Sequence, residues 1–147
     1  MSILSFIIRF IEESRGADKS IFSNSAFGGN NFAEPSDLIE LDDFGNFQIA
    51  GLEIESIFAP GHTKGSVIFT VDNQMLISGD VLFAGGIGRT DLPTGSATDM
   101  RKTLRERVLT LPDGLNVLPG HGGQTTIAIE RVRNPYLQSD FLDQSGR

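Results

Sequence analysis

The chain has 147 residues, a length typical of one domain, and its 19 Asp and Glu residues outnumber 12 Lys and Arg to give a net charge of −7. This acidic balance argues against nucleic acid and anionic membranes as partners. Cysteine is absent, which excludes disulfides, thiolate metal sites and a cysteine nucleophile, and is consistent with an expected cytoplasmic location. Histidine occurs only twice, as His62 and His121.

The predicted elements begin with an apolar run, Ile3 to Ile11, which we expect to be a helix with few solvent contacts. The run is too short to span a bilayer and lacks the features of a secretory signal. A loop rich in Ser, Asn and Gly is expected over 14–36. Strand-like segments follow at 38–41, 47–50, 52–58, 66–71 and 74–78, the last two forming a hairpin across Asp72 and Asn73.

The second half of the chain alternates between helix and strand patterns. A Gly-rich loop at 84–98 precedes a helix predicted over 99–111, whose apolar stripe is Met100, Leu104, Val108 and Leu111. A short strand at 116–118, a helix at 125–133 and a polar, frayed tail at 138–147 complete the chain. The order predicts an α/β (α+β) chain with a mixed sheet, flanking helices and one domain over 1–147.

Three potential metal ligands share one pattern, because each lies in a Gly-containing turn directly after an apolar strand. These are His62 and His121, each in a Pro-Gly-His turn, and Asp80, in a Ser-Gly-Asp turn. Strand ends place such side chains along one edge of a sheet, and imidazole and carboxylate groups suit zinc, iron or manganese. A single Gly-His or Gly-Asp turn is more often an ordinary loop or cap, but the combination, which uses every histidine, favours a metal site.

Several motifs together resemble the metallo-β-lactamase superfamily, in its glyoxalase II-like (hydroxyacylglutathione hydrolase-like) branch. Residues 59–66 (APGHTKGS) resemble its third-histidine motif, 76–83 (LISGDVLF) its bridging-aspartate motif, and 117–122 (VLPGHG) its last histidine motif. The loop 85–93 (GGIGRTDLP) and the segments at 125–127, 130–131 and 134–137 also match that branch. The resemblance covers residues 20–137 and is specific because the motifs occur in this order.

The resemblance implies an αββα sandwich with a dinuclear metal site, usually zinc, that hydrolyses hydroxyacylglutathione-type thioesters. By resemblance, His62 completes the ligands of one ion, His121 those of the other, and Asp80 bridges them as the catalytic carboxylate. Arg89 and Asp91 are expected to brace the loop beside the site through an ion pair. The small-molecule partner implied is a thioester.

The sequence departs from the family in its first motif, His-x-His-x-Asp-His, which supplies four of the seven usual ligands in the family. Both histidines of this chain are already assigned, so the motif is absent. We therefore expect an N-terminally truncated domain that holds at most one ion and is weakly active or inactive alone. The alternative is an inactive binding module that assembles as a homodimer or with a complementing N-terminal fragment.

Overall fold

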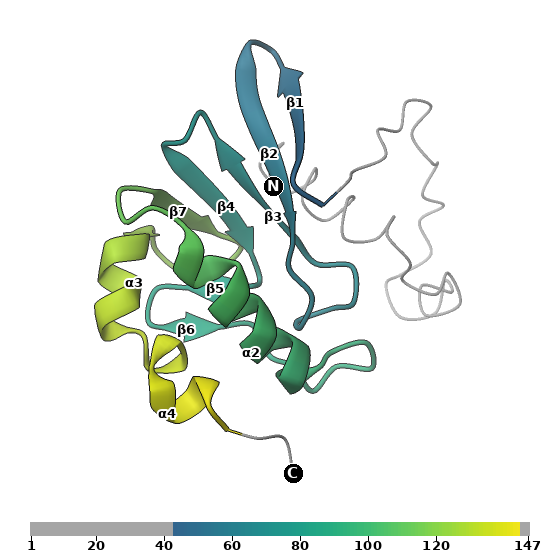
Figure 1. Cartoon of the computed structure of the whole chain (residues 1–147), viewed down its shortest axis with the longest axis vertical. Helices are drawn as coiled ribbons and strands as arrows, with labels where there is room; N and C mark the ends of the chain where they lie inside the picture. The colour runs from purple at the N-terminus through teal and green to yellow at the C-terminus, as the bar shows by residue number, and fades with distance from the viewer. Residues whose placement is uncertain (1–42, 145–147) are drawn as a thin grey trace.

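A computed structural model describes residues 43–144, which form a six-stranded sheet, a small hairpin and helices (Figure 1). The predictions for 3–11, 14–36 and 38–41 lie outside the described residues, as do the last three residues. In the described part of the chain, no helix is long and apolar enough to cross a membrane.

The large sheet has the strand order β1-β2-β3-β4-β7-β8. Its members are β1 (Gly45–Ile49), β2 (Leu52–Phe58), β3 (Val67–Val71), β4 (Met75–Gly79), β7 (Asn116–Pro119) and β8 (Thr125–Thr126). Among the strands of residues 43–144, only β4 and β7 pair in parallel, so the predicted mixed sheet is confirmed. The predicted β3–β4 hairpin is also confirmed, and its turn residues Asp72 and Asn73 both have positive φ, at 49° and 52°, as a tight type I′ turn requires.

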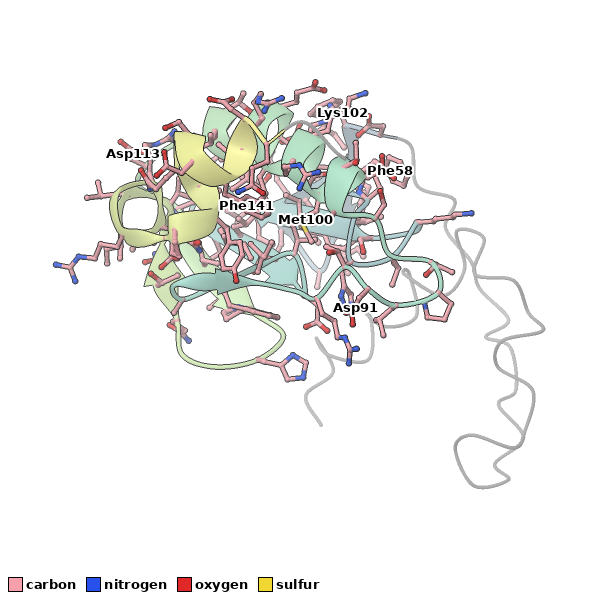
Figure 2. The ribbon with its side chains drawn as sticks, turned by 90° about the horizontal axis from the view of Figure 1, so that it is seen from below. Phe58, Asp91, Met100, Lys102, Asp113 and Phe141 are labelled. Carbon is pink, nitrogen blue, oxygen red and sulfur yellow. The ribbon has the colours of Figure 1, made fainter. Side chains whose placement is uncertain are left out.

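One face of the sheet carries the main core. Apolar residues of β2, β3, β4 and β7 on this face pack against α2 (Ala97–Glu106), the 3₁₀ turn η1 (Val108–Thr110) and α3 (Ile127–Arg133). The predicted stripe is confirmed, since Met100, Leu104, Val108 and Leu111 are all buried. Figure 2 shows Met100 directed from α2 toward the interior and Lys102 directed away from it.

The opposite face carries a second apolar cluster built from strand residues alone. Val67, Phe69, Val71 and Ile77 form it, with Phe47, Ile54, Phe58 and Met75 packed against them. None of the described helices contributes to this cluster. Residues 43–144 therefore supply one large sheet, the small β5–β6 hairpin and the helices on one face of the large sheet. This arrangement is part of the sandwich that the family resemblance implies.

Several predicted boundaries were wrong. Within the expected loop 84–98, Gly86 and Ile87 form β6, which pairs with β5 (Leu82–Phe83), and α2 already begins at Ala97. The helix predicted over 99–111 is divided at Arg107, after which the chain tightens into η1. The helix predicted over 125–133 begins two residues later, because Thr125 and Thr126 pair with β7 before Thr126 caps α3.

The tail is not frayed over its described part. After the 3₁₀ turn η2 (Pro135–Leu137), residues Ser139–Leu142 form α4. Leu142 is buried in the main core, and the Arg105 guanidinium donates a hydrogen bond to its carbonyl. The polar composition of the tail conceals the apolar contacts of Leu142 and of Phe141, which also packs against the main core.

Candidate metal centre

The sheet topology brings the three predicted ligands to one edge. His62 lies in the turn after β2, Asp80 follows β4 directly, and His121 lies two residues after the end of β7. Strand β3 is antiparallel to both β2 and β4, and β7 is parallel to β4. The C-terminal ends of β2, β4 and β7 therefore point the same way, as the sequence analysis expected.

The Asp80 carboxylate lies between the two imidazole rings. Its Oδ1 is 2.8 Å from His121 Nδ1, and its Oδ2 is 3.5 Å from His62 Nε2. The shorter contact is a hydrogen bond in which His121 Nδ1–H donates to the carboxylate. Asp80 thus contacts a different histidine through each of its oxygens.

His62 is held from several directions. Its Nδ1–H donates to the backbone carbonyl of Arg89 at 2.8 Å, and its side chain is only 13% exposed. Helix α2 fixes the turn that carries it: Thr103 Oγ1 donates to the Pro60 carbonyl at 2.6 Å. The amide of Ser96, which caps α2, donates to the carbonyl of Gly61 at 2.8 Å. The ring orientation of His62 is therefore set by the protein.

The His62–Asp80 contact has features that suit a cation. A carbonyl can only accept, so Nδ1 of His62 carries a proton, and in the neutral ring the lone pair of Nε2 faces Asp80 Oδ2. Two acceptors facing each other are stable only if a proton or cation lies between them. Two zinc ligands at about 2.0–2.2 Å from a tetrahedral ion lie roughly 3.3–3.6 Å apart, which matches the observed separation of 3.5 Å.

His121 is placed differently. Its side chain is 75% exposed, and apart from Asp80 it contacts the edge of the Phe83 ring, with ring centroids 5.9 Å apart. The preceding residue is anchored, because the amide of Gly120 donates to the Gly79 carbonyl at 2.8 Å. Across residues 43–144, no three His, Asp or Glu side chains converge in a way that could hold a metal ion by themselves. The three residues fit a metal as a His62–Asp80 pair with His121 adjoining it.

The predicted Arg89–Asp91 ion pair is present. Arg89 Nε and Nη2 donate to the two oxygens of Asp91, both at 2.7 Å. These hydrogen bonds lower the pKa of Asp91 from 3.8 to about 2 and raise the pKa of Arg89. Figure 2 shows Asp91 on the loop at the side of the molecule away from the helices. Both side chains are mostly exposed, so solvent screens the pair and its contribution to stability is small.

Residues that contact the site or are buried near it carry no metal-ligand signal in the sequence. Arg89 acts on His62 through its backbone carbonyl, a contact that no side-chain pattern reveals. Thr103 reads as an ordinary residue of a helix but holds the Pro60 carbonyl. Glu130 and Asn134 stand out in the sequence only as parts of the segments 130–131 and 134–137 that resemble the family, although both are buried.

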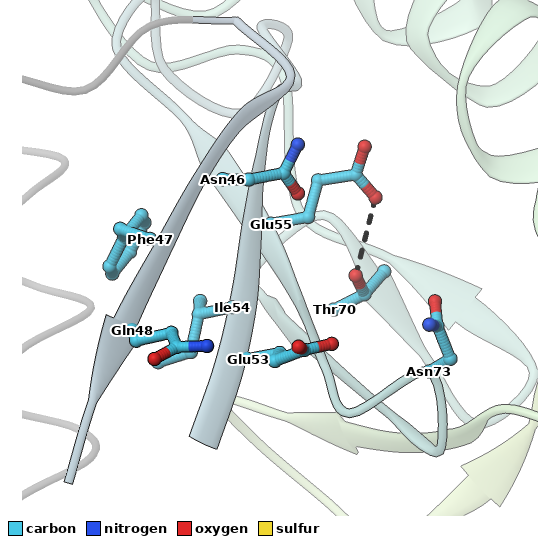
Figure 3. Close-up of a pocket in the computed structure, with 8 residues that line it drawn as sticks. All are labelled: Asn46, Phe47, Gln48, Glu53, Ile54, Glu55, Thr70 and Asn73. Carbon is cyan, nitrogen blue, oxygen red and sulfur yellow. Dashed lines mark hydrogen bonds between the residues drawn. The ribbon is translucent and has the colours of Figure 1, made fainter. Parts of the chain in front are cut away.

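One hollow of the described residues lies away from the candidate centre. A cavity of about 460 Å³ opens over β1, β2 and β3, lined by Asn46, Phe47, Gln48, Glu53, Ile54, Glu55, Thr70 and Asn73. Figure 3 shows Thr70 and Glu55 joined by a hydrogen bond in this cavity. It contains none of the predicted ligands and adds nothing to the candidate centre.

Comparison with known proteins identifies the family. The family model described as the metallo-beta-lactamase superfamily matches residues 10–121. The probable metallo-hydrolase YqgX of Bacillus subtilis is 47% identical over 112 residues, covering 75% of this chain and 52% of that protein. The hydroxyacylglutathione hydrolase GloC of Haemophilus influenzae is 39% identical over 109 residues, covering 74% of this chain and 48% of that protein.

A solved structure adds a neighbour that contains metal. The crystal structure of TTHA1623 in a di-iron-bound form has a TM-score of 0.59 and 36% identity, and the match covers 70% of this chain and 50% of that one. The chain thus spans about half the length of the curated relatives it matches.

Proposed function

The chain belongs to the metallo-beta-lactamase superfamily, and we propose that it functions in metal-dependent hydrolysis, with His62, Asp80 and His121 as metal ligands. The observation that carries this proposal is the Asp80 carboxylate, whose two oxygens each face a different histidine. A carboxylate in this position can bind one ion or bridge two. Divalent metal binding is expected for the superfamily, and a di-iron neighbour exists.

Within the centre, the chain's own residues have separate tasks. Asp80 supplies negative charge beside both rings, and the Arg89 carbonyl keeps the lone pair of His62 Nε2 directed into the site. When bound, a divalent metal supplies Lewis acidity that activates water and stabilises an oxyanion on the attacked carbonyl. Catalytic zinc sites typically have three protein ligands, so we expect at most one ion to be held by these residues.

For the substrate, we propose a thioester of the hydroxyacylglutathione type. The support is the similarity to GloC, whose name gives that activity. This proposal concerns the class of reaction. Zinc is the expected metal, and iron and manganese are compatible with the same ligands. Turnover by this chain alone is expected to be weak because, among the described residues, only His62 and Asp80 are spaced to share an ion, and His121 adjoins them.

The test is native mass spectrometry of the full chain purified without chelator, followed by a hydroxyacylglutathione hydrolysis assay. We expect one ion per chain that is lost in Asp80→Ala, and weak turnover that is abolished by the same change and by His121→Ala. Metal retention without turnover above His121→Ala would overturn the thioesterase proposal but keep the metal centre. Absence of metal at micromolar zinc would overturn both and leave the binding-module hypothesis.

A further inference from the structure

The hairpin β5–β6 connects the candidate centre to the body of the protein. It begins two residues after Asp80 and leads into Arg89. Phe83, the last residue of β5, contacts the His121 ring edge-on, and the Arg89 carbonyl accepts the His62 Nδ1–H at 2.8 Å. The position of this segment therefore affects the contacts of both histidines.

A buried polar pair lies beneath the hairpin. Glu130 of α3 is 2% exposed, and Asn134, which follows α3, is fully buried. Glu130 Oε2 accepts the amide of Gly85 at 2.8 Å, and Asn134 Nδ2 donates to the Gly86 carbonyl at 3.0 Å. Asn134 Nδ2 also donates to Glu130 Oε2 at 2.8 Å, so the two side chains form one hydrogen-bonded unit that binds the hairpin backbone.

A buried charge such as that of Glu130 is unusual for a side chain whose role is only to pack in the core. None of the ion pairs found in residues 43–144 involves Glu130, so its carboxylate is compensated by hydrogen bonds alone. The third hydrogen bond to this carboxylate is donated by Thr125 Oγ1 to Glu130 Oε1 at 2.7 Å. Removing one partner of a buried hydrogen bond leaves the other unsatisfied and costs stability. The carboxylate at this position is therefore tied to the Gly85 amide, and so to the hairpin that leads into Arg89.

We propose that Glu130 and Asn134 are positioning residues for the candidate metal centre. By fixing the hairpin on α3, they hold the Arg89 carbonyl where it keeps Nδ1 of His62 protonated and Nε2 free to bind a cation. The inference rests on the proposed function only in taking His62 as a ligand. Histidine ligands in metal sites characteristically donate their second ring N–H to a carbonyl or carboxylate, and losing that support costs about 10–100-fold in metal affinity.

The test uses the ring ¹⁵N chemical shifts of the full chain, labelled at histidine, at mildly alkaline pH without added metal. Protonated and unprotonated ring nitrogens are well separated in such spectra, and the chain has only two histidines to assign. We expect wild-type His62 to be protonated at Nδ1 and unprotonated at Nε2. A wild-type ring with the opposite tautomer would overturn the proposal without any variant.

Two variants should disturb this state. Glu130→Ala removes the acceptor of the Gly85 amide. Asn134→Ser keeps an oxygen to cap the Tyr136 amide but is too short to reach the hairpin carbonyls. In both, we expect the His62 ring signals to move toward a mixture of tautomers and zinc affinity to fall about 10–100-fold.

Two controls separate positioning from general stability. Glu130→Gln should restore the wild-type His62 signals, because its amide oxygen can accept from Gly85 while Thr125 Oγ1 turns to accept from its NH₂. Arg131→Ala removes three hydrogen bonds of the same helix, to Asp113, Leu109 and Leu111, none of which touches the hairpin. Its His62 signals should stay in place.

Unchanged His62 signals in a folded Glu130→Ala or Asn134→Ser variant would overturn the proposal, as would equal changes in Arg131→Ala. If Glu130→Ala does not fold, the wild-type tautomer and Asn134→Ser decide. Because no metal is needed, the outcome is independent of the proposed function: tautomer changes without zinc binding would support the positioning role while the metal centre fails.

Discussion

The two Pro-Gly-His turns have the same three residues but different surroundings. In the first, Gly61 is buried with φ of 145°, and a Cβ added to it would lie 2.5 Å from Met100 Cα in α2. In the second, Gly120 is exposed, and an added Cβ would lie 2.5 Å from Asp80 Oδ1, at the end of a side chain, and 3.3 Å from the Gly79 backbone. The nearest atoms to the first glycine are those of a helix backbone, whereas the nearest atom to the second is a side-chain oxygen that can move.

The histidines differ accordingly. His62 is 13% exposed and donates to a backbone carbonyl, whereas His121 is 75% exposed and donates to Asp80. The His62 half of the centre is therefore preorganised by the fold, and the His121 half is set by Asp80 and by whatever the centre binds. A shared tripeptide does not imply a shared degree of order.

The largest difference in stability is expected between the alanine variants of Gly61 and Gly120. Gly61→Ala should destabilise the fold by about 3 kcal/mol or more, because it combines overpacking against a helix backbone with a strained φ. Gly120→Ala should cost about 1 kcal/mol or less, since the Asp80 carboxylate can rotate away. Chemical denaturation of both variants, monitored by circular dichroism, measures the difference.

The same two glycine variants separate an effect on folding from an effect on the geometry of the metal centre. Displacing the Asp80 carboxylate should weaken zinc binding by Gly120→Ala about 10–100-fold even though the fold survives. Equal stability losses in the two variants would contradict the contrast between a fixed turn and an adjustable one.

A smaller contrast is expected for the histidines themselves, measured by thermal unfolding in the presence of a chelator. His62→Ala should lower the unfolding free energy by about 1–2 kcal/mol, because a hydrogen bond and a largely buried ring are lost. His121→Ala should change it by no more than about 0.5 kcal/mol, as is usual for exposed side chains. A larger loss in His121→Ala would show that the exposed ring supports the fold.

The sequence predicts the ligand-bearing edge because strand ends and glycine turns are local signals. His62, Asp80 and His121 each follow an apolar strand, and the mixed sheet brings those ends together. What the sequence does not predict depends on contacts between distant elements. The Arg89 carbonyl, which acts on a residue 27 positions away, and Glu130, which reaches Gly85 across 45 positions, are of this kind.

The secondary-structure errors have a similar origin. Residues 86 and 87 were expected in a loop because glycine disfavours strands, yet they pair with Leu82 and Phe83 while Asn134 and Glu130 hold the backbone. The tail was expected to fray because it is polar, but the burial of Leu142 orders it. In both cases tertiary contacts override the local preference.

The smallest effect is expected at Asp91, whose pairing with Arg89 through the side chain can be separated from the carbonyl contact of Arg89 with His62. Because the pKa of Asp91 is lowered from 3.8 to about 2 in the folded chain, the pair stabilises the fold above about pH 4. This contribution is lost as the pH falls from about 4 to about 2, where the folded carboxylate takes up its proton. The pair is exposed, so the change should be slight and should shrink further in high salt.

Carboxyl ¹³C titration by NMR measures this directly, with Arg89→Gln as the matched variant. The substitution should raise the pKa of Asp91 toward its usual 3.8, while the ring signals of His62 stay unchanged because residue 89 keeps its backbone carbonyl. A shift of the His62 signals in Arg89→Gln would show that the ion pair, and not the hairpin anchored by Glu130 and Asn134, sets the position of that carbonyl. The preorganised half of the centre would then depend on an exposed, salt-sensitive contact, and His62 would lose much of its distinction from His121.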